Sequence, residues 1–211
     1  MSYDFRYVTR KEAVEVKKVL ISLINDVQDE VRDNFTFSYY FIGSSARNMI
    51  TEDEKSNIGF DFDVNIEVND PDENYEPNEI KHILMQAFND VIRQNKLGYG
   101  NCEDSTRVFT IKFIDHENSR IVHSCDFAIV YNCSNGRQQY IRFNKSQTSY
   151  YWEYQPDGYN LDDKISAIKS KGFWDDVLEL YISKKNNNAN PDKKSRSLFA
   201  ETIKEVYEQH F

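Results

Sequence analysis

The chain has 211 residues, of which 29% are charged and 14% are aromatic, and its formal net charge is −9. This composition is typical of a folded protein with a sizeable core and excludes a disordered chain. The excess of acidic residues disfavours nucleic-acid binding of the kind that depends on Lys and Arg neutralising phosphates.

The cysteines and the lengths of the apolar stretches indicate the cellular compartment in which the protein is expected. The three cysteines form no Cys-x-x-Cys pair, and their odd number favours free thiols in a reducing compartment. Residues 1–10 lack the apolar run of a signal peptide, and no stretch approaches the ~20 apolar residues of a membrane span. We therefore expect a cytoplasmic protein without a membrane partner.

The first elements are a helix, a strand and a turn. Thr9 and Glu12 have the spacing of a capping box, and apolar residues recur at helical spacing behind them, which predicts a helix to about residue 33. Residues 36–42 are aromatic and β-branched, which predicts a strand ending at Gly43. One of the two serines that follow is expected to cap a short helix through residue 50.

The middle of the chain predicts further strands around a second helix. Residues 51–57 are polar and indicate a solvated loop, and 58–68 predict a second strand. A helix is expected to start at Pro77 and to stop near Gly98. Two apolar runs at 106–115 and 120–132 predict a hairpin, and a further strand is expected at 137–143.

After residue 156 the pattern becomes helical. A break at Gly172 interrupts it, and a polar, basic loop at 184–197 precedes a last helix at 197–210. The order of elements predicts an α+β sheet domain at 1–155 and a helical C-terminal region at 156–211.

Two aspartates stand out in the second strand. Asp61 and Asp63 lie two residues apart, so in a strand their side chains share one face, with Phe60, Phe62 and Val64 on the other. Paired carboxylates repel each other, and oxygen ligands on a rigid strand suit Mg²⁺. The alternative is an exposed strand with a solvated acidic face.

Two other features accompany this pair. Asp126 lies in another apolar strand, between Cys125 and Phe127, where it could meet the pair across the sheet. Gly43 and the serines after it lie at a strand-to-helix turn, where glycine permits close backbone approach and free N–H groups can receive an anion.

Gly-Ser at a strand end, Asp-x-Asp on the next strand and a third strand aspartate together resemble the polymerase-β-like nucleotidyltransferase superfamily. The resemblance covers roughly residues 36–131, and the leading helix and the C-terminal helices also fit its plan. It implies a mixed sheet flanked by helices. The spacer from Ser44 to Asp61 is longer than the family's usual pattern, which is consistent with an inserted loop at 51–57.

The resemblance also implies the chemistry. The catalytic and metal-binding residues would be three carboxylates that hold Mg²⁺, or alternatively Mn²⁺: Asp61, Asp63 and Asp126. The phosphates of an NTP such as ATP would be bound at the turn formed by Gly43, Ser44 and Ser45. The expected reaction is the transfer of an NMP to an acceptor hydroxyl with release of pyrophosphate.

Further nucleotide-binding candidates come from the residues themselves. Arg47 lies one turn into the expected short helix, where it could reach a phosphate; a solvated arginine is the alternative. Lys169 lies on the helix after the sheet domain, where a lysine could contact the triphosphate, although ordinary amphipathic helices have the same pattern. Acidic segments near the site favour a small molecule, another nucleotide or a protein hydroxyl over nucleic acid as acceptor.

Three other classes compete with a nucleotidyltransferase. Haloacid-dehalogenase-like phosphatases fit poorly, because Asn65 stands where they carry Thr or Val. An EF-hand is excluded, because Tyr75 and Lys81 replace its Gly and Glu. The third is a non-catalytic protein of the same fold that binds a nucleotide or a partner, such as a toxin–antitoxin or regulatory component.

Overall fold

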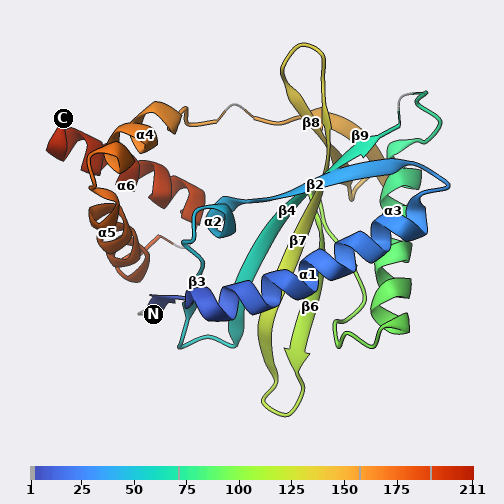
Figure 1. The fold of residues 1–211 in the computed structure, drawn as a ribbon, viewed down its shortest axis with the longest axis horizontal. Coiled ribbons are helices and arrows are strands. Elements are labelled where there is room, and N and C mark those ends of the chain that lie inside the picture. Colours follow the sequence, from blue (N-terminus) through green and yellow to red (C-terminus); the bar gives the residue numbers. More distant parts are fainter. Residues whose placement is uncertain (1–2, 71, 157, 191) are drawn as a thin grey trace. The chain divides into compact units, whose positions relative to one another are not determined.

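The computed structural model describes residues 3–70, 72–156, 158–190 and 192–211 (Figure 1). These residues form two compact units. The larger unit is made of residues 8–51 and 57–155, and the smaller one of the described residues in 3–7, 52–56 and 156–211.

The larger unit is a seven-stranded sheet with helices, as far as the chain is described. Its helices are α1 (Arg10–Val31), α2 (Gly43–Ala46) and α3 (Pro77–Gln94). Its strands are β2 (Thr36–Ile42), β4 (Ile58–Asn69), β5 (Glu103–Asp104), β6 (Phe109–Asp115), β7 (Arg120–Asn132), β8 (Gln138–Asn144) and β9 (Ser149–Tyr154).

The sheet is mixed. Its strands run in the order β2-β4-β7-β6-β5, and β8 pairs with the end of β7 and with β9. The pair β4–β7 is parallel, whereas the other pairs in the sheet are antiparallel. The expected α+β class with a mixed sheet flanked by helices is therefore confirmed, as is the hairpin of β6 and β7.

The start of α1 follows the local sequence. The Thr9 side chain accepts a hydrogen bond from the Glu12 amide, and the Glu12 carboxylate accepts one from the Thr9 amide. This reciprocal capping, predicted from the sequence, satisfies donors that a helix N-terminus otherwise leaves unpaired.

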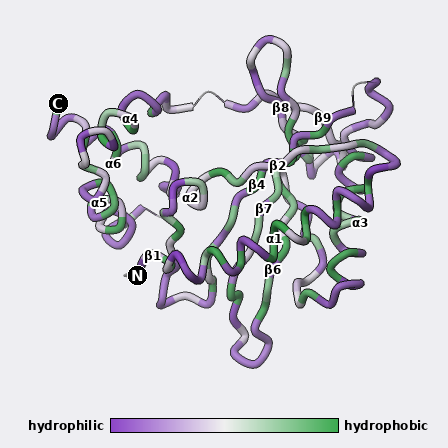
Figure 2. Tube along the Cα trace, in the orientation of Figure 1, coloured by the Kyte–Doolittle hydropathy of each residue, from purple (hydrophilic) through white to green (hydrophobic). Residues whose placement is uncertain are grey.

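One face of the sheet is apolar and carries the core. Helices α1 and α3 pack against each other and bury their apolar stripes with alternate residues of β4, such as Phe62 and Val64. Figure 2 shows hydrophobic and hydrophilic residues alternating along both helices, as amphipathic helices require. The intervening residues of β4, among them Asp61 and Asp63, lie on the other face.

The turn after β2 is tighter than predicted. Helix α2 ends at Ala46, so the expected continuation to residue 50 is wrong, and no side-chain hydrogen bond caps it. The reason lies in the backbone: the Ser44 carbonyl accepts from both the Arg47 and Met49 amides, which reverses the chain after a single helical turn.

The smaller unit contains five described elements. They are β1 (Phe5–Tyr7), β3 (Thr51–Asp53, whose first residue belongs to the larger unit), α4 (Asp162–Ser170), α5 (Trp174–Asn186) and α6 (Ser195–His210). The predicted break at Gly172, where φ is +81°, separates α4 from α5. The predicted basic loop is shorter than expected, because α5 extends to Asn186 and α6 begins at Ser195.

The predicted solvated loop at 51–57 is wrong for its first three residues, which form β3 and pair with β1. Glu52 is buried there, and its carboxylate forms a 2.5 Å ion pair with Arg6, which offsets the cost of removing the charge from water. Strand β1 is also bound to α5: the Tyr7 hydroxyl donates to the Leu178 carbonyl at 2.8 Å. The compact unit of the C-terminal helices thus includes residues 3–7, and a domain division at 155/156 stays a prediction.

Candidate active site

Three carboxylates meet on the polar face of the sheet. Parallel pairing of β4 with β7 places Asp63 directly beside Asp126 and Asp61 beside Ser124. Because Asp61 and Asp63 share a face of β4, all three aspartates lie in one small region of the sheet. The structure therefore brings together the three aspartates that the sequence singled out.

Two hydroxyl groups hold these carboxylates. Ser124 donates to Oδ1 of Asp61, and Thr110 of the neighbouring strand β6 donates to Oδ1 of Asp126 at 2.5 Å. Sequence reasoning missed both residues. A signal was available for Ser124, which precedes Asp126 by two residues and so faces the same side of β7. Thr110 required the register of the hairpin.

The electrostatics of the cluster reflect an excess of negative charge. Burial, and then the charges of Asp126 and Asp61, raise the pKa of Asp63 from 3.8 to about 6, while the Arg47 guanidinium lowers it in part. Burial and the charge of Asp61 also raise the pKa of Asp126, against the effect of the Thr110 hydrogen bond. The site therefore favours anything that supplies positive charge.

The residues fit a divalent cation by their chemistry. All three are carboxylates, the oxygen ligands that Mg²⁺ prefers, and their mutual repulsion would be relieved by a cation between them. In the described ranges, however, no three His, Cys, Asp or Glu side chains already stand as a metal-binding group. Binding would draw the carboxylates toward one point.

The glycine turn touches this cluster. Gly43 has φ +63°, and a Cβ atom added to it would lie 2.4 Å from Oδ2 of Asp63. Only glycine therefore allows the turn both its conformation and its closeness to the carboxylate. Arg47, at the end of the turn, is near enough to Asp63 to lower its pKa.

The two predicted serines differ in their surroundings. The Ser45 hydroxyl is buried and donates to the Ile42 carbonyl at 2.9 Å, so it holds the turn together. The Ser44 side chain has no partner among the residues that the structure describes, so of the two it is the one free to donate to a ligand.

Lys169 belongs to the smaller unit. Its Nζ lies 4.5 Å from the centroid of the Trp174 ring, a cation–π contact between α4 and the start of α5. The predicted role of Lys169 at the phosphates stays a prediction.

Solved structures resemble the chain at low sequence identity. Vibrio cholerae DncV, described as a cyclic AMP-GMP synthase in complex with the linear intermediate 5′ pppA(3′,5′)pG, matches with a TM-score of 0.68 and 11% identity over 98% of this chain and 74% of that one. This chain has the polymerase-β-like nucleotidyltransferase fold. The resemblance of the glycine turn and the three strand aspartates to the polymerase-β-like superfamily implied this fold, and the match confirms it.

Other structures with the nucleotidyltransferase fold match similarly. DncV in its GTP-bound form has a TM-score of 0.61 and 15% identity over 95% of this chain, which spans about half (52%) of that protein. CdnC of E. coli MS115-1 with ATP has a TM-score of 0.51 and 15% identity over 97% of this chain and 62% of that one.

By sequence comparison, no protein-family model and no curated protein matches the chain. In the part of the chain that is described, no helix has the length and apolarity needed to cross a membrane.

Proposed function

We propose that the chain is a metal-dependent nucleotidyltransferase that transfers an NMP from an NTP to an acceptor hydroxyl and releases pyrophosphate. The observation that carries the proposal is the meeting of Asp61, Asp63 and Asp126 on one sheet face, with Gly43 against Asp63. Similar structures bound to GTP and to ATP support it.

Asp61, Asp63 and Asp126 would hold Mg²⁺ or Mn²⁺. When bound, the metal would offset the charge of the triphosphate and stabilise the attacking and leaving oxygens of an in-line displacement. The chain's own contribution is to fix the donor oxygens: the hydroxyls of Ser124 and Thr110 orient Asp61 and Asp126.

The turn would receive the triphosphate. Gly43, Ser44 and Arg47 offer backbone N–H groups, a free hydroxyl and a positive charge, and Ser45 fixes the shape of the turn. Lys169 is proposed as a further positive charge for the phosphates.

Asp126 would act on the acceptor. Its carboxylate takes the proton of the acceptor hydroxyl, whose oxygen then forms a bond to the α-phosphorus. The bond from the α-phosphorus to the bridging oxygen breaks, and pyrophosphate leaves with that electron pair.

The acceptor is proposed to be a small molecule, another nucleotide or a protein hydroxyl. The linear dinucleotide bound to DncV supports a nucleotide, although this chain spans only part of that protein. The odd number of cysteines supports a cytoplasmic location for the reaction.

Pyrophosphate release tests the proposal. Each of the four NTPs is supplied with candidate acceptors and with Mg²⁺, Mn²⁺ or EDTA. We expect release from at least one NTP with metal and none with EDTA, and at least a ~100-fold loss in Asp61→Asn and Asp126→Asn. Asp29→Asn, a change at an exposed carboxylate of α1, is the matched control.

The alternative is a non-catalytic protein that binds nucleotide or a partner on the same fold. NTP binding without pyrophosphate release under any of these conditions would favour it. Release that persists in EDTA, or in both aspartate variants, would contradict the site.

A further inference from the structure

A network of uncharged polar groups continues the polar face beyond the carboxylates. Asn65 follows Asp63 by two residues on the same face of β4, and Tyr40 is its paired residue on β2. Gln138 reaches both from β8: its Nε2 donates to the Tyr40 hydroxyl at 2.8 Å, and its Oε1 accepts from Asn65 Nδ2 at 3.4 Å. The Tyr40 hydroxyl also accepts from Asn65 Nδ2 at 3.5 Å.

This network contains an unsatisfied acceptor. Asn65 is only 5% exposed, and its Oδ1 atom is buried without a hydrogen-bond partner among the described residues. Natural proteins rarely leave a buried polar atom unpaired, because the lost hydrogen bonds to water are not replaced. Asn65 Oδ1 therefore has the capacity to accept a further hydrogen bond.

A donor stands next to this acceptor. The Tyr40 hydroxyl accepts two hydrogen bonds, and within the described chain its own proton has no recipient. A hydroxyl can donate one bond as well as accept two. Tyr40 and Asn65 thus present a donor and an acceptor side by side, the pattern that matches the hydrogen-bonding edge of a nucleobase.

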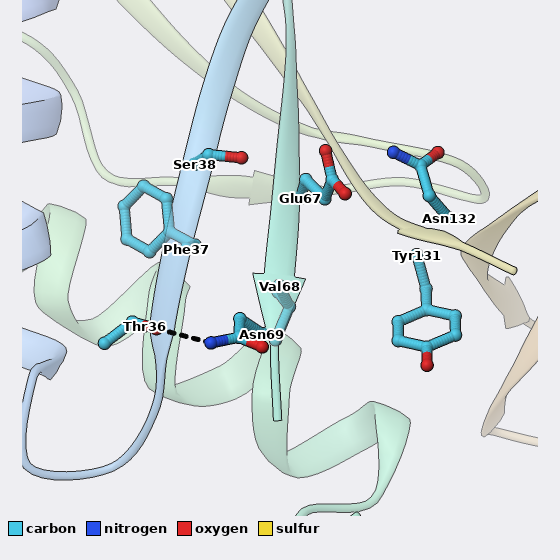
Figure 3. Close-up of a pocket in the computed structure, with 8 residues that line it drawn as sticks. All are labelled: Thr36, Phe37, Ser38, Glu67, Val68, Asn69, Tyr131 and Asn132. Atoms are coloured by element: carbon cyan, nitrogen blue, oxygen red, sulfur yellow. Dashed lines mark hydrogen bonds between the residues drawn. The ribbon is translucent and has the colours of Figure 1, made fainter. Parts of the chain in front are cut away.

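The network borders a cavity of about 500 Å³ (Figure 3). Asn132 links the two, because it lines the cavity and its Oδ1 accepts from Gln138 Nε2 at 2.8 Å. The pairing of β4 with β7 ends at Glu67, and the cavity opens between the two strands there. Figure 3 shows Ser38 and Glu67 beside each other, with Asn132 and Tyr131 across the gap. Its size suits a small molecule.

The order of features along the face decides what the network would bind. Helix α2 continues from the end of β2 away from Tyr40, whereas the antiparallel register places Asp63 beside Ile42 and Asn65 beside Tyr40. Along the polar face of the sheet, the glycine turn therefore comes first, then the carboxylates, then the network and finally the cavity. In an in-line displacement the attacking group enters opposite the leaving group. With pyrophosphate at the turn, the acceptor enters from the network.

We propose that Tyr40, Asn65 and Gln138 form the acceptor subsite and bind the base of a nucleoside, part of which extends into the cavity. The proposal rests on the proposed nucleotidyltransferase function. The subsite takes an uncharged hydrogen-bonding moiety rather than a phosphate, because its groups are neutral amides and a hydroxyl and the cavity carries the carboxylate of Glu67.

The first test measures binding without the reaction. Adenosine, guanosine, cytidine and uridine are titrated into the full chain without metal or NTP by calorimetry. We expect one base to bind best, and Tyr40→Phe and Gln138→Leu each to weaken it about threefold to tenfold, the effect of one lost hydrogen bond. Both side chains are partly exposed, so the variants should fold.

Two neighbours serve as matched controls. Tyr39→Phe removes a hydroxyl that bonds to Asn25 on the other side of β2, and Gln139→Leu changes the opposite face of β8. We expect both to bind the nucleoside as the unaltered chain does. Equal effects of the test and control variants, or no nucleoside binding at all, would overturn the subsite.

The second test separates the subsite from the reaction. In pyrophosphate-release assays, the two test variants should raise the KM of the acceptor about threefold to tenfold and leave the KM of the donor NTP unchanged. A rise in the donor KM alone would contradict the assignment. Metal-dependent pyrophosphate release without nucleoside binding would overturn the subsite and leave the proposed function standing. Nucleoside binding that the test variants weaken, without any pyrophosphate release, would overturn the proposed function and leave the nucleoside-binding site standing.

Discussion

Asp63 is the residue on which the electrostatics of the site concentrate. It lies between Asp61 on its own strand and Asp126 on the next, and Gly43 covers its Oδ2 atom. Its raised pKa means that the folded, metal-free protein holds this carboxylate against an unfavourable charge. Natural proteins accept such a cost where function requires it.

We predict that Asp63→Asn abolishes pyrophosphate release and stabilises the metal-free protein at pH 7.5. The pKa is about 6 in the folded state against 3.8 unfolded, so stability falls as the pH rises from about 4 to 6 and stays reduced above that. The variant should gain ~1–3 kcal/mol at pH 7.5 and nothing near pH 4.

Thermal melts in EDTA at both pH values, compared with Asp29→Asn, measure this effect. A variant that gains as much at pH 4 as at pH 7.5 would show that charge is not the cause.

Gly43 constrains the position of the Asp63 carboxylate. Gly43→Ala should lower both stability and activity, because the added methyl group meets the Asp63 carboxylate and φ is +63°. Gly136→Ala is the matched control, since Gly136 has φ +79° and open space around its Cβ position. It should cost only the ~1 kcal/mol of backbone strain.

Melting temperatures and pyrophosphate release are compared for the two alanine variants. Equal losses in both would mean that the contact with Asp63 does not constrain the turn.

At the scale of elements, the parallel pair β4–β7 builds the site. It connects two strands far apart in the sequence and sets Asp63 beside Asp126. The backbones approach closely at Gly59, where an added Cβ would lie 1.8 Å from the Val122 carbonyl oxygen. The strand register that aligns Asp63 with Asp126 thus depends on Gly59, a residue without a functional side chain.

We predict that Gly59→Ala destabilises the fold by ~3 kcal/mol or more, because a strand must move to admit the methyl group. Gly100→Ala is the control: the nearest atom, the Lys112 carbonyl oxygen, would be 3.8 Å from the new Cβ, an ordinary contact. Urea denaturation gives both free energies of unfolding. A loss below about 1 kcal/mol in Gly59→Ala would show that the strands adjust freely.

At the scale of the whole molecule, charge limits the partners. The chain has 26 Lys and Arg against 35 Asp and Glu. Its acidic excess repels a polyanion, and salt screens this repulsion only in part.

We predict no tight binding of single- or double-stranded RNA or DNA in gel-shift assays at low salt. As the positive control, NTP binding with Mg²⁺ is measured on the same preparation to show that the protein is folded and able to bind a ligand. Submicromolar binding that weakens steeply with added salt would reveal a basic track and reverse the choice of acceptor.

The local sequence determined the elements whose signals are local. The capping box of α1, the strand at 36–42, the helix from Pro77 and the break at Gly172 all appear as predicted, because caps, periodicity and glycine act within a few residues. The alternation of Asp61 and Asp63 with aromatic residues also determined which face they share.

Contacts between residues distant in the sequence could not be predicted and are seen only in the folded chain. The burial of Glu52 requires Arg6, the support of Asp126 requires Thr110, and the network at Asn65 requires Tyr40 and Gln138. Strand register sets these contacts, and no short stretch of sequence encodes it. The three carboxylates and the turn were therefore evident from local sequence patterns, whereas the residues that hold them and lie beside them became evident only from the strand pairing.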